Sequence, residues 1–137
     1  MATLDFQFAP TTPNDGVSPS VVQAYNVAAA TATPLPVVLA TPENTEGLVV
    51  VVDVTTASGT GVTFTIEGVD RASKKTWVIL TSTAKTGAGT TIMRVSASLA
   101  ASANVTAQDL VPDEIVIRAA HSDSAALTYT VGVHFTS

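Results

Sequence analysis

Cysteine is absent from the 137-residue sequence, and charged residues make up only 12% of it. The lack of cysteine excludes a disulfide framework and thiolate chemistry. The six Lys and Arg residues are scattered along a chain of net charge −5, and Lys74 and Lys75 are the only adjacent pair. Phosphate binding needs clustered basic residues, so we expect no nucleic acid partner.

Long hydrophobic runs are also missing. The longest, at residues 48–52, is far too short to cross a bilayer. The N-terminal segment MATLDFQFAP has neither the basic region nor the apolar stretch of a signal peptide. We therefore expect a protein that is made in the cytoplasm and has no membrane partner.

Recognisable catalytic and metal-binding patterns are lacking too. His121 and His134 are the only histidines, and neither lies beside a G-x-S-x-G motif. His121 lies near Asp123 in an expected turn, where a surface pair is the simpler interpretation. The sequence has no HExxH motif and no Asp-rich calcium loop. We expect no enzymatic activity, no metal site and no cofactor.

The sequence contains few of the residues that a carbohydrate site usually needs. Glu67 and Asp70 are candidates for the facing carboxylates that a glycosidase needs. Sugar-binding sites usually add aromatic platforms, and the chain has one Trp and two Tyr. We expect Trp77 to be a core residue near the middle of the domain.

Valine and alanine supply most of the hydrophobic residues, which make up 46% of the chain, and threonine and serine are abundant. β-Branched residues fit a pleated, half-buried surface, so the composition favours strands over helices. Lone soluble monomers usually carry more charge. The low charge therefore indicates a surface that faces other subunits, and a secreted or thermally robust domain with a Thr-rich surface is the alternative.

Alternating apolar and polar residues predict short strands. At residues 62–69 the alternation places Val62, Phe64 and Ile66 on one face and polar residues on the other. Residues 48–55 are Val-rich, which is typical of a strand that is central or buried on both faces. The predicted strands are residues 37–39, 48–55, 62–69, 76–81, 90–97, 115–119 and 127–135, and residues 21–27 are either a further strand or part of an Ala-rich loop.

Short strands with turn residues at regular spacing predict an all-β fold. We expect a seven- to eight-stranded antiparallel β-sandwich of Ig-like or jelly-roll type at residues 21–137. An extended N-terminal arm at residues 1–20 precedes it, because several prolines interrupt this segment. Residues 99–107 are small and polar, and form either one helical turn or an irregular crossing.

The arm holds the candidate contact residues. Leu4, Phe6 and Phe8 alternate with polar residues near its start. One interpretation is a short edge strand that packs on its own domain. The other is a strand that lies on a neighbouring subunit, with Leu4, Phe6 and Phe8 as the contacts.

The stretch LVVVVDVTTASGTGVTFTIEGVDRASKKTWVILTSTAKTGAGTTIMRV resembles a recurrent pattern in small virion proteins of tailed bacteriophages. Its elements are a Val-rich strand that ends in DVT, a Ser/Gly turn, the strand VTFTIEGVD, a polar loop and the strand WVILTS. The later segment LVPDEIVIRAAHSDSAALTYTVGV fits the same pattern. The resemblance covers residues 46–135 and leaves out the arm.

This resemblance implies a capsid decoration (cement) protein on the virion surface, made in the host cytoplasm. Its expected partners are the major capsid protein or other virion subunits, and it is expected to self-associate, for example as a trimer. A tail or baseplate accessory protein is one alternative, and a carbohydrate- or receptor-binding sandwich module is another. An exposed Trp77 beside a groove would favour the carbohydrate-binding module. The pattern contains no catalytic signature, so no site is transferred residue by residue.

Overall fold

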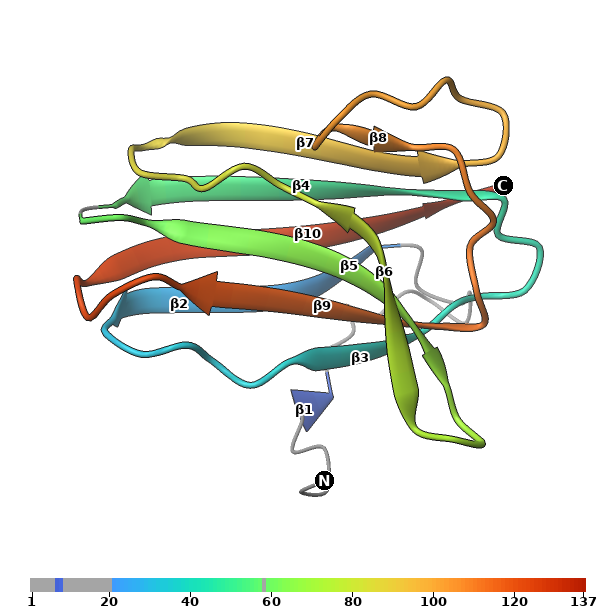
Figure 1. Ribbon diagram of the computed structural model, residues 1–137, viewed down its shortest axis with the longest axis horizontal. Coiled ribbons are helices and arrows are strands. Elements are labelled where there is room, and N and C mark those ends of the chain that lie inside the picture. The colour runs from blue at the N-terminus through green and yellow to red at the C-terminus, as the bar shows by residue number, and fades with distance from the viewer. Residues whose placement is uncertain (1–6, 9–20, 58) are drawn as a thin grey trace.

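Two β-sheets pack face to face in the computed structural model, which describes residues 7–8, 21–57 and 59–137 (Figure 1). Sheet A has five strands in the order β1-β3-β9-β5-β6, and sheet B has five in the order β2-β10-β4-β7-β8. The strands are β1 (Gln7–Phe8), β2 (Val21–Ala30), β3 (Val37–Ala40), β4 (Gly47–Thr56), β5 (Val62–Asp70), β6 (Lys75–Thr81), β7 (Gly89–Ser96), β8 (Thr106–Ala107), β9 (Glu114–His121) and β10 (Leu127–Thr136).

The eight longer strands pair in a nested, antiparallel order. The first pairs with the last (β2 with β10), the second with the seventh (β3 with β9), the third with the sixth (β4 with β7), and the two middle strands (β5 with β6) pair with each other. This order is that of a jelly roll. The expected all-β sandwich is confirmed, and the topology is the jelly-roll type rather than the Ig-like one. β1 and β8 are two-residue additions that run parallel to their neighbours.

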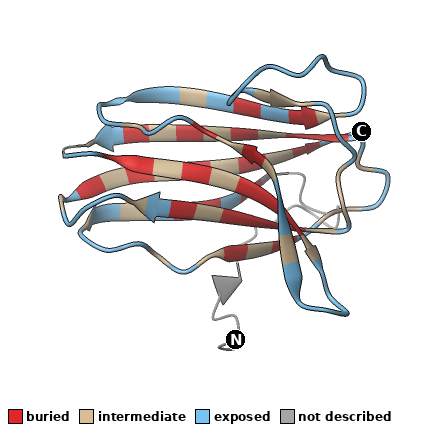
Figure 2. Cartoon of the chain, viewed as in Figure 1, coloured by how far each residue is buried: buried red, intermediate tan, exposed pale blue. Residues whose placement is uncertain are grey.

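The pleat of each strand decides which side chains enter the core. In β4, Val50, Val52 and Val54 are buried, and the residues between them are only partly buried. Val131 and Val133 of β10 lie opposite two of these valines and are buried with them. Figure 2 shows the same alternation along the strands of both sheets. Each sheet thus presents one face to the core and leaves the other at the surface.

Aromatic side chains fill part of the space between the sheets. Phe64 and Tyr129 are fully buried, and their rings meet edge to face with centroids 5.1 Å apart. Tyr25 makes a second edge contact with Tyr129, at 6.3 Å between centroids. Edge-to-face pairs contribute about 0.5–1.5 kcal/mol beyond the area they bury. These rings therefore tie β2 and β10 of sheet B to β5 of sheet A.

The prediction that Trp77 is a core residue is wrong, because 46% of this residue is exposed. Trp77 lies in β6, in the hairpin that β5 and β6 form. This hairpin projects beyond the rest of the sandwich (Figure 1). The second sheet therefore does not cover the projecting part, and apolar side chains on it reach solvent.

Other expectations at single segments are settled by the structure. Residues 21–27 do form a strand, and it continues to Ala30. Residues 48–55 lie in a central strand whose outer side is only partly buried. Residues 99–107 form an irregular crossing that ends in the short β8. The prediction that His121 lies in a turn is wrong, since this residue ends β9.

Replacing Phe64 with alanine tests the core. The substitution removes a fully buried ring and should lower the free energy of unfolding by about 3–5 kcal/mol. Urea unfolding followed by circular dichroism measures the change. Val78→Ala is the control, because Val78 is 63% exposed and its truncation should change stability by less than about 0.5 kcal/mol. A loss below about 1 kcal/mol for Phe64→Ala would contradict the assigned core.

Candidate interaction surfaces

The predicted contact residues of the arm are only partly described. Phe8 belongs to β1, whose backbone pairs in parallel with β3 at the edge of sheet A, with Phe8 opposite Val38. This short piece of the arm therefore lies on its own domain. Leu4 and Phe6 lie outside the described residues. A contact between these three residues and a neighbouring subunit stays a prediction.

The outer side of sheet B, called the sheet B face below, is broad and weakly charged. Its centre is a row of three residues on neighbouring strands, Gly132, Val51 and Ile92, which the strand register places side by side. Asp53 and Arg94 are the only Asp, Glu, Lys or Arg residues in the set that forms it. The set comprises Gln23, Val49, Val51, Asp53, Ile92, Arg94, Thr130, Gly132 and His134.

A shallow hollow marks the middle of the sheet B face. It has a volume of about 240 Å³, and Gln23, Val51, Thr130, Gly132 and His134 are among the residues that line it. The hollow exists because Gly132 carries no side chain between its neighbours. A Cβ atom built there would lie 3.8 Å from the His134 ring, so the space is large enough for a methyl group. A small apolar group of a partner therefore fits this position.

Strand β2 forms one edge of sheet B. Its ten residues, VVQAYNVAAA, include no charged residue and no proline. One side of β2 pairs with β10, and no strand of the described part of the chain pairs with the other side. Charges and prolines are the usual protection of an exposed strand edge. In the described part of the chain, the protection that β2 shows is irregularity, since the β2–β10 register shifts at two places.

A groove lies between the β5–β6 hairpin and the start of β9. It has a volume of about 610 Å³, and its lining includes Trp77, Asp70, Arg71, Asp113 and Glu114. The guanidinium of Arg71 donates two hydrogen bonds, of 2.7 and 2.6 Å, to the carboxylate of Glu114. These bonds hold the pKa of Glu114 below its usual value. The fork joins the hairpin loop to β9 at the groove.

The two candidate carboxylates Glu67 and Asp70 have separate structural roles. Glu67 is 6% exposed on the outer side of sheet A, where it forms an ion pair with Arg118 of β9. Asp70 accepts hydrogen bonds from Ser73 and from the backbone of Ala72 in the hairpin turn, and these bonds lower its pKa. The structure therefore does not join these two groups in one site.

His121 contacts a tyrosine and not an acidic partner. Its Nε2 atom lies 2.9 Å from the hydroxyl of Tyr129, and its buried Nδ1 atom has no hydrogen-bond partner among the described residues. Asp123 accepts hydrogen bonds from Thr60 and from the backbone of Ala125. Burial lowers the pKa of His121, and the charge of Asp123 opposes this effect. Burial also raises the pKa of Tyr129.

Sequence reasoning missed the groove because it placed Trp77 in the core. A signal for exposure was present, since Trp77 follows the polar loop of residues 70–74 and so lies near the end of a hairpin.

Among the described residues no group of three or more His, Asp or Glu side chains is placed to hold a metal ion. The same residues include no helix that is long and apolar enough to span a bilayer.

Comparisons with protein-family models, with curated proteins and with solved structures find no match for this chain.

Acidification should weaken the fold through His121. The unfolded chain binds a proton at the ordinary histidine pKa of about 6.5, and burial makes the native protein resist that proton. The stability that this difference in pKa provides is fully present above about pH 6.5. It is lost as the pH falls from about 6.5 towards the lowered pKa of the native protein. Urea unfolding at a series of pH values measures the slope.

His121→Gln should flatten this slope between about pH 7 and pH 5, where the unfolded histidine titrates. His134→Gln should leave the part of the slope that belongs to His121 in place. If the His121→Gln variant keeps the full slope, the partly buried imidazole is not its source.

Removing Arg118 should cost more stability than removing Arg71. Arg118→Ala leaves the carboxylate of Glu67 buried without its cation, and we expect a loss of about 2–3 kcal/mol, reduced from the fully buried case because Arg118 is partly exposed. The Arg71 side chain is 83% exposed, so solvent screens its charge and Arg71→Ala should cost much less stability than Arg118→Ala. Urea unfolding measures both variants.

The double variant Glu67→Gln/Arg118→Met removes both charges of the buried pair. It should recover most of the stability that Arg118→Ala loses, because no buried charge remains uncompensated. Equal losses for Arg118→Ala and Arg71→Ala would show that burial of Glu67 does not matter.

Proposed function

We propose that this protein is a structural virion protein of a tailed phage that binds the outside of the capsid as a decoration protein and stabilises the shell. The observation that carries the proposal is the sheet B face, with its row of Gly132, Val51 and Ile92 and its two charged residues. A sparsely charged β-sheet surface is easily desolvated. Its expected occupants are the major capsid protein or other virion subunits.

The mechanism needs no catalysis. A protein that binds only the assembled shell stabilises that shell by mass action. Each copy can bind weakly, because many symmetric copies that bridge neighbouring capsid subunits act together. The rigid jelly roll supports this role, since a face built on paired strands loses little entropy on docking.

Strand edges provide a second means of attachment in this proposal. An extended segment can add a strand to an open sheet edge and gain affinity from backbone hydrogen bonds without using charge. The uncharged β2 edge is suited to receive such a segment, either from the shell or from another copy in a homo-oligomer such as a trimer. The arm residues Leu4, Phe6 and Phe8 are suited to supply one through the edge of β1 that faces away from β3.

Reconstitution on particles tests the proposal. Purified protein is added to particles that lack it, and bound copies are counted after sedimentation. Ile92→Lys places a charge in the centre of the sheet B face at a residue that is 39% exposed, so it should reduce binding at least about tenfold without changing the melting temperature. Leu110→Lys is the matched control, because Leu110 is 75% exposed and lies outside that face.

The arm is tested in the same assay with a chain that lacks residues 1–20. We expect this chain to fold, since its core is made by the later strands, and to lose particle binding. Full binding by the truncated chain would refute the role of the arm. Hundreds of copies per head would agree with decoration, whereas a handful per particle would identify a tail or baseplate protein instead.

A further inference from the structure

The geometry of the groove beside Trp77 points to a second binding site, for a neutral saccharide. The site combines an exposed indole face with hydrogen-bonding groups that are already held in place. It lies on the β5–β6 hairpin and the start of β9, away from the sheet B face in the fold. It therefore goes beyond the proposed attachment to the shell.

The indole of Trp77 forms a supported platform. Trp77 lies opposite Gly68 in the β5–β6 pair, and a Cβ atom built on Gly68 would come within 2.2 Å of the ring. The ring can therefore rest against the backbone of β5 only because this residue is glycine. Trp77 is still 46% exposed. An aromatic ring with one side packed and area left open offers apolar contact to the C–H face of a sugar ring.

Polar groups for hydroxyl recognition lie around this platform. Arg71 and Glu114 fix each other through two hydrogen bonds and keep further donor and acceptor capacity. In the described part of the chain, the Asp113 carboxylate makes neither a hydrogen bond nor an ion pair. Paired hydroxyls of a sugar match planar carboxylate and guanidinium groups, which bind through two atoms at once. The groove volume of about 610 Å³ is within the range of ligand pockets.

Charge selects a neutral ligand. The lining carries three carboxylates (Asp70, Asp113 and Glu114) and one guanidinium (Arg71), which leaves a net charge of −2. This charge disfavours phosphates and acidic sugars. A basic side chain of a partner protein would find only the Asp113 carboxylate unengaged, because the Asp70 and Glu114 carboxylates are already bound by Ser73 and Arg71. A saccharide can use the remaining hydrogen-bonding capacity of engaged groups.

The test begins with a printed array of neutral and sialylated glycans, probed with the labelled protein. The best neutral glycan is then titrated in solution. Trp77 is the only tryptophan in the chain, so its fluorescence reports directly on the groove. We expect saturable binding with a shift in tryptophan emission.

Variants separate the platform from the rest of the hairpin. Trp77→Ala should lower affinity at least about tenfold, measured by calorimetry because this variant has no tryptophan. Gly68→Ala keeps the indole but displaces it, and should weaken binding while still allowing the fluorescence measurement. Val78→Ala, on the next residue of β6, is the matched control and should bind as the unmodified protein does.

The outcomes are decisive for the site and independent of the capsid proposal. An array without signal, binding of sialylated glycans alone, binding of a lysine-rich peptide in place of glycans, or unchanged glycan affinity in Trp77→Ala overturns the inference. Trp77→Ala should bind particles normally, since the groove is not on the sheet B face. Loss of particle binding by this variant would instead show that the groove contacts the shell.

Discussion

The structure depends on one constraint, which is that each strand of a two-layered sandwich can give only every second side chain to the core. Val50, Val52 and Val54 of β4 meet this constraint from sheet B, and Val62, Phe64 and Ile66 of β5 meet it from sheet A. The core takes four aromatic side chains, Tyr25, Phe64, Tyr129 and Phe135, from a chain that is 5% aromatic. The outer faces carry mainly Thr, Ser, Gly and further Val. Because these residues are uncharged, the surface is weakly charged.

Strand positions and faces could be predicted from the sequence, whereas strand neighbours could not. The alternation at residues 62–69 and 127–135 gave β5 and β10 to within one residue, because a period of two is a strong local signal. The same alternation does not say which strand lies beside which. The jelly-roll order depends on pairings such as that of β2 with β10, which are far apart along the chain.

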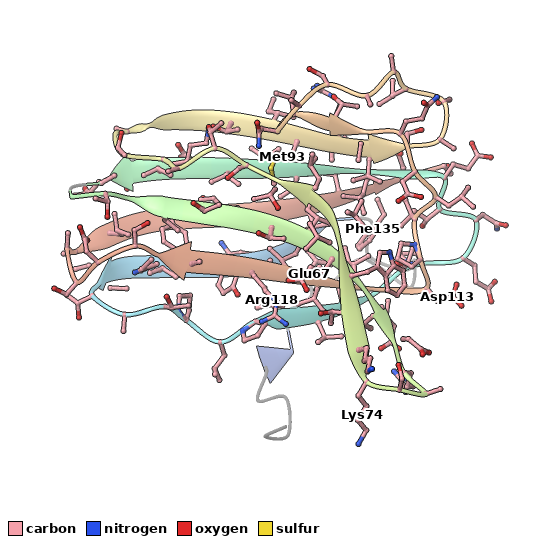
Figure 3. All side chains as sticks on the ribbon, viewed as in Figure 1. Glu67, Lys74, Met93, Asp113, Arg118 and Phe135 are labelled. Carbon is pink, nitrogen blue, oxygen red and sulfur yellow. The ribbon has the colours of Figure 1, made fainter. Side chains whose placement is uncertain are left out.

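The parts of the candidate sites that escaped prediction depend on three-dimensional context. Trp77 looks like a core residue by type, and its exposure arises because the hairpin projects beyond the sandwich. Glu67 and Arg118 are separated along the chain, and only the β5–β9 register places them on one side of sheet A, where Figure 3 shows the two labelled side chains. Lys74, also labelled there, lies at the tip of the hairpin.

Two binding roles are proposed for two separate surfaces. The sheet B face is proposed to bind the shell, and the groove on the projecting hairpin is proposed to bind a sugar. The first is central, and electron cryomicroscopy of purified virions tests it most directly. The account predicts a jelly roll on the outside of the capsid, with Val51 and Ile92 against capsid subunits and Trp77 facing solvent. A virion in which the sheet B face points away from every neighbour, or one that does not contain this protein, would contradict it.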